Sequence, residues 1–185
     1  MQPWKTIARR TLLAHSKFLS VEEHTVMLPD GRTIADWPWV ITPDYVNVVP
    51  VTEEGKILCF RQTKYGIDGT SLAPIGGYLE PGEQPLAAAE RELREEAGYE
   101  ASDWRELGRY RVDSNRGAGM ANLYLALGAR RTAKAASDDL EQQELVQLTV
   151  KEVDQALSDG QFKVLAWAAA LALALPVIRD SGAKP

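Results

Sequence analysis

The stretch that decides the fold runs from Gly77 to Tyr99 and reads GYLEPGEQPLAAAERELREEAGY. Its second half predicts one helix over 85–97, because proline suits a first helical position, consecutive alanines favour helix, and Gly98 suits a left-handed stop. Apolar residues recur there at spacings of three and four, which predicts a narrow buried stripe. The stripe consists of Leu86, Ala89, Leu93 and Ala97.

Three acids lie beside that stripe. At about 100° per residue, Glu92, Glu95 and Glu96 fall within roughly 100° of one another. Like charges at these spacings repel, so a cation is expected to compensate them. Clustered carboxylates suit Mg²⁺ or Mn²⁺, which keep positions open for water and substrate phosphates. The alternative is a solvated helix face with internal ion pairs, and Glu90 with Arg94 at i, i+4 fits it.

The spacing of the whole segment resembles the Nudix box: Gly, five residues, Glu, seven residues, then Arg-Glu-aliphatic-any-Glu-Glu-any-Gly-apolar. Tyr99 is aromatic where the family prefers an aliphatic residue. The resemblance implies hydrolysis of a nucleoside diphosphate linked to a further group X, at a phosphoanhydride bond and with divalent cations. The matching residues are Gly77, Glu83, Arg91, Glu92, Leu93, Glu95, Glu96, Gly98 and Tyr99.

The resemblance also implies roles for these residues. Glu92 and Glu96 are expected to bind the metal directly, and Glu95 acts as a ligand or as the general base. Arg91 orients the acids and is counted with the catalytic residues. Glu83 either contacts the metal or holds Arg91. The expected metal ligands are therefore the Gly76 carbonyl and the side chains of Glu83, Glu92, Glu95 and Glu96.

The catalytic base is expected on a second segment. In the family branch that acts on ADP-sugars, the base lies on an acidic loop before the last strand. Here that loop is 137–144, SDDLEQQE. Glu141 is the first choice for the base, with Glu144 and Asp139 as alternatives. A plain solvated loop is the competing interpretation.

Four residues are candidates for substrate binding. Trp37 or Trp39 could stack on a base, or could anchor the surrounding strands in the core. Arg61 and Arg116 could pair with phosphates through forked hydrogen bonds, or could be ordinary exposed arginines. Arg61 is preferred because the Phe-Arg-Gln sequence around it resembles the family's.

Composition excludes several classes. A chain of 185 residues with 45% hydrophobic residues can bury a core as one domain with an appended element. A net charge of −5 argues against a general nucleic-acid binder. The single Cys59, in an apolar run, fits a buried thiol in the cytoplasm. The apolar run 164–178 is shorter than the roughly 20 residues that cross a bilayer, so no membrane role is expected.

The remaining pattern predicts an α+β fold. An antiparallel meander is expected over 11–41, with strands at 18–28 and 32–41 around a Pro-Asp-Gly turn. Further strands and helices, with a polar loop at 129–141, suit the Nudix fold, a mixed sheet sandwiched between helices. The expected strands are 45–51, 57–62, 104–112, 121–127 and 144–150, and the expected helices are 151–158 and 162–175.

The expected domains are an N-terminal meander (1–42), a Nudix domain (43–178) and a tail (179–185). ADP-sugar pyrophosphatases carry a similar N-terminal sheet that is exchanged in a dimer. The string Leu-Pro-Asp-Gly-Arg-Thr from Leu28, followed by Trp37, resembles theirs. This resemblance implies a homodimer.

The substrate is less firmly specified than the reaction. ADP-ribose enzymes of the family carry a proline where this chain has Asn115, and diadenosine-polyphosphate enzymes carry a tyrosine where it has Arg116. ADP-ribose is the leading substrate, giving AMP and a sugar phosphate. The alternatives are an oxidised nucleoside triphosphate, a dinucleotide or a GDP-sugar. A non-catalytic nucleotide-sugar sensor is a further alternative.

Overall fold

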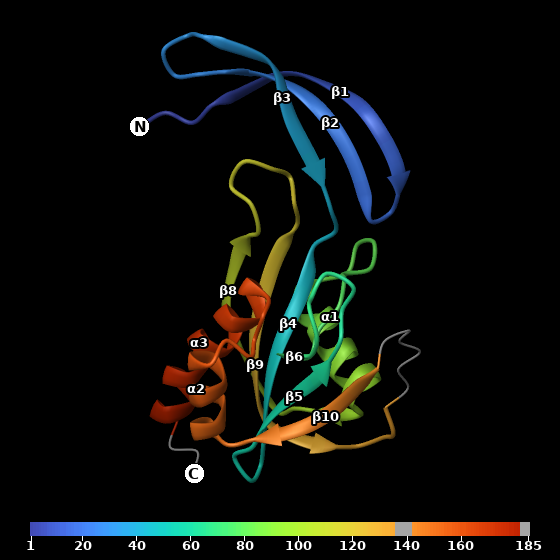
Figure 1. Ribbon diagram of the computed structural model, residues 1–185, viewed down its shortest axis with the longest axis vertical. Coiled ribbons are helices and arrows are strands. Elements are labelled where there is room, and N and C mark those ends of the chain that lie inside the picture. The colour runs from blue at the N-terminus through green and yellow to red at the C-terminus, as the bar shows by residue number, and fades with distance from the viewer. Residues whose placement is uncertain (136–141, 182–185) are drawn as a thin grey trace. The chain divides into compact units, whose positions relative to one another are not determined.

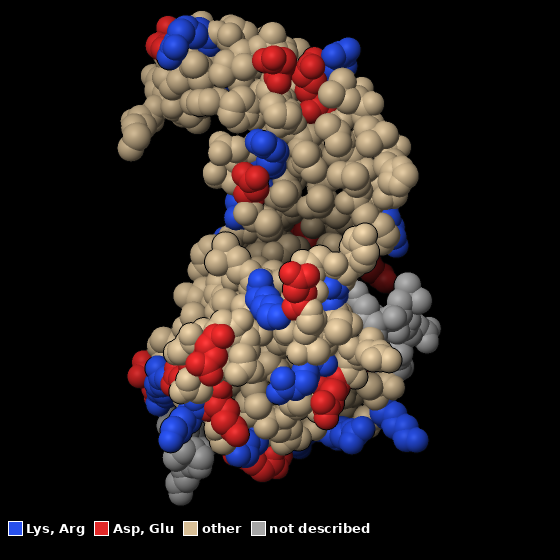
Figure 2. All heavy atoms as spheres, viewed as in Figure 1, with Lys and Arg blue, Asp and Glu red and all other residues tan. Residues whose placement is uncertain are grey.

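The structure, a computed structural model, describes residues 1–135 and 142–181. The chain forms two compact units, one of residues 1–44 with 110–120 and the other of the remaining residues (Figure 1). The predicted domain limits at residues 42 and 178 stay predictions. On the face drawn in Figure 2, acidic and basic side chains are interspersed.

The first unit is an antiparallel sheet in the order β1-β2-β3, with strands Lys5–Ser16, Leu19–Met27 and Thr33–Ile41. The predicted turn is present, and Gly31 adopts a φ of 85° there. Strand β1 was not predicted from the sequence. Its sequence, KTIARRTLLAHS, lacks the alternation of apolar and polar residues that marks a half-buried strand, and all its residues are exposed.

The second unit is built on a mixed sheet in the order β10-β5-β4-β9-β7, with β6 beside β5 and β8 beside β9. Strands β4 and β9 are parallel, and the other described pairings along this order are antiparallel. The expected strand 121–127 extends to Arg131, so the polar loop begins later than predicted. The strands are β4 Tyr45–Thr52, β5 Ile57–Gln62, β6 Ser71–Ala73, β7 Tyr99–Glu100, β8 Asp103–Arg111, β9 Met120–Arg131 and β10 Gln143–Leu148.

Helices cover both faces of this sheet, as Figure 1 shows. The alternation of β4 builds both cores: Val46 and Val48 pack with Leu93 on one side, and Val49 and Val51 pack with the other helices. The predicted fold class, a mixed sheet sandwiched between helices, is confirmed. The helices are α1 Pro85–Glu92 with the π-helical turn η1 Leu93–Ala97 on the first side, and α2 Val150–Ser158 and α3 Leu165–Asp180 on the second.

The helix predicted over 85–97 has two parts. It is α-helical to Glu92 and continues as the π-helical turn η1 to Ala97, after which Gly98 takes the predicted left-handed conformation at φ 74°. A π turn accommodates an extra residue in the helical repeat and is frequent at functional sites. The angular positions of Glu95 and Glu96 relative to Glu92 therefore differ from those of an ideal α-helix.

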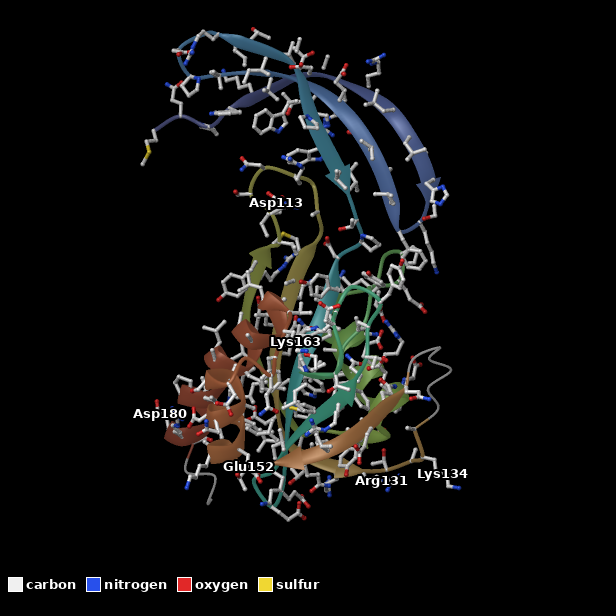
Figure 3. The ribbon with its side chains drawn as sticks, in the orientation of Figure 1. Asp113, Arg131, Lys134, Glu152, Lys163 and Asp180 are labelled. Atoms are coloured by element: carbon white, nitrogen blue, oxygen red, sulfur yellow. The ribbon has the colours of Figure 1, made fainter. Side chains whose placement is uncertain are left out.

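The C-terminal part needs two corrections. The strand expected over 144–150 ends at Leu148, because Thr149 caps α2 in a capping box with Glu152, labelled in Figure 3. The helix expected over 162–175 is Leu165–Asp180 and contains Pro176. This proline is tolerated because it lies on the exposed side of the helix, where water can satisfy the freed carbonyl. No helix of residues 1–135 and 142–181 is long and apolar enough to cross a membrane.

Candidate active site

Arg91, in the last turn of α1, is the centre of the acidic cluster. Its guanidinium donates to both carboxylate oxygens of Glu83 at 2.9 and 3.0 Å, to Glu92 Oε1 at 2.7 Å and to Glu95 Oε2 at 3.3 Å. It also donates to the carbonyl of Tyr78 at 3.1 Å. The hydrogen bond from Arg91 lowers the pKa of Glu83, and the same hydrogen bond with Glu83 raises the pKa of Arg91. Arg91 thus ties the loop before the helix to the helix itself.

Glu92 is the buried acid of the cluster, with 8% of its surface exposed. Burial raises the pKa of its carboxyl, and the hydrogen bond from Arg91 opposes that rise. Its carboxylate lies directly against the loop that contains Gly76 and Gly77, called the box loop below. A Cβ at Gly77 would stand 2.3 Å from Glu92 Oε1. The first glycine of the box is therefore needed for close approach of this acid to the backbone.

The loop at Gly76 joins the sheet to the last acid of the box. The Gly76 amide lies 3.4 Å from Glu96 Oε2 as a donor, and a Cβ there would stand 2.1 Å from the Val46 carbonyl oxygen. The amide of Val46 donates to the Gly77 carbonyl at 2.9 Å, which fixes the loop on β4. Gly76 and Glu96 are thus brought together, and their roles as metal ligands stay predictions.

Two cavities adjoin this loop, and both are lined by Gly76, Glu96, Asn47, Lys64 and Trp167. The larger measures about 430 Å³ and the smaller about 50 Å³. Sequence reasoning missed Lys64 and Trp167. The available signals were a lysine shortly after the end of an apolar strand and a lone tryptophan in an alanine-rich helix.

Arg61 and Glu144, which the sequence offered as site residues, line neither of these cavities. Arg61 is exposed on β5, while its neighbour Gln62 is buried and lines the smaller cavity. Since side chains alternate along a strand, Arg61 lies on the opposite face from that cavity. Glu144 is exposed and stands opposite Arg61 in the β5–β10 register. Glu141 and Asp139 lie outside the described residues, so the choice of base stays a prediction.

In the first unit, Trp37 and Trp39 line a third cavity of about 350 Å³. Trp37 meets Trp4 edge-on at 5.2 Å between ring centroids, while Trp39 stacks on His24 at 5.1 Å. A Cβ at Gly117 would stand 2.2 Å from Trp39 Nε1, so the backbone there presses against the indole. Trp39 is therefore held between His24 and the Gly117 backbone.

Arg116 belongs to the loop between β8 and β9, which begins near Asp113, labelled in Figure 3. Its guanidinium donates to the carbonyl of Asn115 at 3.0 Å, so the side chain folds back onto its own loop. Its predicted contact with a phosphate stays a prediction. His24, which sequence reasoning did not place here, is buried and lies 2.7 Å from Glu22 Oε2 through its Nε2 atom.

The box acids fit a hard divalent cation by donor type, since carboxylate and carbonyl oxygens are the ligands that Mg²⁺ and Mn²⁺ prefer. In residues 1–135 and 142–181, no three His, Cys, Asp or Glu side chains are arranged as a ligand group. The Arg91 guanidinium pairs with Glu83, Glu92 and Glu95 and places a positive charge beside them. The donors are present, and Arg91 holds three of them.

Comparison with known families and structures identifies both regions of the chain. Residues 42–168 match the NUDIX domain, and residues 4–40 match the nucleoside diphosphate sugar hydrolase N-terminal domain. A solved structure described as an ADP compounds hydrolase superposes with a TM-score of 0.81 at 21% identity, covering 100% of this chain and 98% of the other. At that identity, the superposition shows a common fold.

Two named proteins are similar in sequence to this chain. The methanol dehydrogenase activator of Bacillus methanolicus is 30% identical over 156 residues, which cover 84% of this chain and 83% of that protein. The ADP-ribose pyrophosphatase of Bacillus subtilis is 37% identical over 97 residues, or 52% of this chain and 51% of that protein. The domain match spans the loop, the helix and the sheet that position the acids, and on that ground the chain belongs to the family of Nudix hydrolases.

Proposed function

We propose that this chain hydrolyses the diphosphate bond of an ADP-linked compound, with ADP-ribose as the leading substrate and Mg²⁺ or Mn²⁺ as the cation. The observation that carries the proposal is the placement of Gly76 and Glu96 on the wall of a cavity, beside the acids that Arg91 gathers. The match to a nucleoside diphosphate sugar hydrolase N-terminal domain supports this substrate class. So does the similarity to a protein named ADP-ribose pyrophosphatase, about half of whose length the match covers.

The reaction consumes one water molecule. A new bond forms between the water oxygen and one phosphorus, the anhydride P–O bond breaks, and ADP-ribose yields AMP and ribose 5-phosphate with release of protons. The divalent cation, when bound, compensates the charge on the attacking and leaving oxygens. Glu92, Glu95, Glu96 and the Gly76 carbonyl would hold it, with Glu83 as a further ligand or as the support of Arg91.

The protein's own task is positioning, since phosphoryl transfer needs little covalent help. Arg91 holds the carboxylates in register with the loop through its contacts to Glu83 and Tyr78. Lys64 lines the cavity with Glu96 and can place a positive charge next to the diphosphate. We assign the role of base, which takes a proton from the attacking water, to Glu141.

A separate part of the proposal concerns the N-terminal sheet, which we expect to bind a nucleobase. Trp37 has a half-buried ring in the cavity of the first unit, and its neighbours there include Lys5 and Arg9. Aromatic and cationic side chains together suit a nucleobase with a nearby phosphate. Trp39 and Arg116 are the other proposed substrate contacts of this unit; Arg61, on the opposite face of β5 from the smaller cavity, is not among them.

We extend the proposal to a homodimer that acts in the cytoplasm. The edge strand β1 is exposed along its length, and its apolar residues Ile7, Leu12 and Leu13 are 58%, 52% and 47% exposed. An exposed edge strand that carries apolar side chains favours pairing with another chain. A sedimentation measurement that finds only monomer at micromolar concentration would remove the dimer from the proposal.

A turnover assay tests the activity. Purified protein is incubated with ADP-ribose and either Mg²⁺, Mn²⁺ or excess chelator, and AMP release is measured. We expect metal-dependent release, lowered about 100-fold or more in Glu96→Gln with unchanged thermal unfolding, because a lost ligand removes several kcal/mol of charge stabilisation. Glu90→Gln, the same change at an exposed position of the same helix, is the matched control. Tight ADP-ribose binding without turnover would favour a sensor and contradict the proposal.

A further inference from the structure

The smaller cavity beside Gly76 is lined by two glutamines to which the proposed function gives no role. Gln62 and Gln143 line this cavity of about 50 Å³ together with Glu96, and all three belong to the second unit. Neither glutamine lines the larger cavity, where Lys64 and Glu96 lie next to the proposed position of the diphosphate. The two glutamines therefore adjoin the last acid of the box from outside the substrate cavity.

Gln62 is a buried polar residue at the end of an apolar strand. Strand β5 reads ILCFRQ, and Gln62 is 6% exposed. Within the part of the chain that the structure describes, its side-chain amide has no hydrogen-bond partner. Ser71, opposite Gln62 on β6, is engaged elsewhere. Its hydroxyl lies 2.8 and 3.0 Å from two backbone carbonyl oxygens, and it accepts from the Lys163 amide at 3.0 Å. Since a buried amide needs partners, those of Gln62 are expected in the cavity that it lines.

Gln143 faces the same cavity from the neighbouring strand. It is the first residue of β10 and stands directly opposite Gln62 in the antiparallel register of β5 and β10, which lie side by side in Figure 1. Side chains of directly opposite residues lie on one face of a sheet, with Cβ atoms about 4.5–5.5 Å apart. Each glutamine amide carries an NH₂ donor and a carbonyl acceptor. The pair thus presents donors and acceptors to one small space.

A water molecule fits this space and can join the amides to Glu96. A buried water needs a cavity of roughly 10–15 Å³ or more and makes about three hydrogen bonds. Such a water would accept from the NH₂ of one glutamine, donate to the carbonyl of the other and donate to the Glu96 carboxylate. The carboxylate can accept this bond, because the Gly76 amide stands at a long 3.4 Å and a carboxylate accepts about four hydrogen bonds in all.

We propose that Gln62 and Gln143 hold a water molecule that hydrogen-bonds the Glu96 carboxylate, which makes both glutamines positioning residues for the divalent cation. The inference rests on the proposed function for the role of Glu96 as a metal ligand. Groups that hydrogen-bond a ligating carboxylate orient it before the cation arrives, so less ordering is left to the binding step. The affinity for the cation therefore depends on two side chains that contact neither the cation nor the substrate.

The test measures the affinity for Mn²⁺ by calorimetry without substrate, and kcat and KM for ADP-ribose at a fixed, subsaturating Mn²⁺ concentration. Gln62→Leu and Gln143→Leu should each lower the Mn²⁺ affinity by about 10- to 100-fold. They should lower kcat as well and leave KM near its wild-type value, because neither residue lines the substrate cavity. Gln147→Leu, the same change at an exposed glutamine of β10 that lines neither cavity, is the matched control.

A double-mutant cycle shows whether the glutamines act through Glu96. In the Glu96→Gln background, Gln62→Leu should cause no further loss of Mn²⁺ affinity, because the ligand that the water orients is already gone. Thermal unfolding of the same samples verifies that each variant is folded. Gln143 is only partly buried, so its variant keeps the proposal testable if Gln62→Leu does not fold.

The outcomes separate this inference from the proposed function. A loss of Mn²⁺ affinity in both leucine variants that disappears in the Glu96→Gln background supports the water-linked pair. Wild-type Mn²⁺ affinity in the folded variants, or an equal loss with and without Glu96, overturns it and leaves the proposed function standing. A crystal structure with either glutamine bonded directly to Glu96 would overturn the water link. A wild type that binds Mn²⁺ without hydrolysing ADP-ribose overturns the proposed function, while the Mn²⁺ affinities of the variants still decide the role of the glutamines.

Discussion

The two neighbouring glycines of the box loop should respond differently to the same substitution. In Gly77→Ala, the new Cβ would lie 2.3 Å from Glu92 Oε1 and 2.5 Å from its carboxylate carbon. Ordinary contact begins at 3.4 Å, so the carboxylate oxygen must retreat by 3.4 − 2.3 = 1.1 Å. The obstacle is the end of a side chain, which can move when the backbone cannot.

The expected result of Gly77→Ala is a loss of rate with little loss of stability. A displacement of about 1 Å in a group that positions the reaction can cost about 100-fold in rate. The displaced Glu92 also weakens its 2.7 Å hydrogen bond with Arg91, which costs on the order of 1 kcal/mol of unfolding free energy. The fold should therefore persist while kcat falls.

Gly76→Ala should instead destabilise the fold. Its Cβ would lie 2.1 Å from the carbonyl oxygen of Val46, which belongs to the central strand β4. Neither backbone can yield without disturbing the sheet. Overpacking of this kind costs about 1–3 kcal/mol, which lowers the melting temperature by about 2–12 °C in a protein of this size.

Thermal unfolding and AMP release from ADP-ribose, measured on the same samples, separate the two effects. Gly66→Ala is the matched control, because its Cβ would meet no atom within 4 Å and its backbone is not in the left-handed region. Retention of kcat within two-fold in Gly77→Ala would refute the positioning of Glu92 by the loop. A melting temperature of Gly76→Ala equal to that of the control would refute the backbone clash.

Four further predictions concern the acidic cluster, the core and the cap of α2. Arg91→Lys cannot reproduce the two parallel hydrogen bonds to Glu83 and should lower kcat, measured by AMP release, at least about 10-fold. A kcat equal to that of the wild type would contradict this role of Arg91. Leu171→Ala, at a fully buried position in α3, should cost about 2–5 kcal/mol in denaturant unfolding, and a cost below 1 would contradict the packing. Thr149→Ala should cost about 1 kcal/mol. Hydrogen bonds from Thr149 lower the pKa of Glu152 below its ordinary 4.5, so the ionised carboxylate stabilises the fold. In unfolding curves from pH 7 to 3, the stability difference between wild type and Glu152→Gln should be largest above pH 4.5 and shrink as the pH falls below it. A stability difference that does not change with pH would contradict this.

Local patterns predicted much of the fold because their causes are local. Proline at position 85, alanines in the first turns and Gly98 at the end predicted the helix that carries the acids, and both termini are as expected. The strand over 18–28 and the turn at Gly31 follow from β-branched residues and a turn sequence. Strand β1 escaped prediction because it is stabilised by pairing with β2, while its side chains stay in water.

In the candidate site, too, some features follow from local sequence and others only from the tertiary structure. The sequence by itself determined the reaction class, because the spacing of Glu83, Arg91, Glu92 and Glu96 resembles the Nudix box, whose positions all lie within one short segment of the chain. Only the tertiary structure brought Lys64, from the loop after β5, and Trp167, from α3, to the cavity beside Glu96. In the sequence, Trp167 is about 100 positions from Lys64 and about 70 from Glu96, and no local pattern encodes their meeting at one cavity. Packing of both helical layers on β4 and β5 brings them there. The box therefore specifies the reaction class, while packing of the helices on the sheet shapes the cavity beside Glu96.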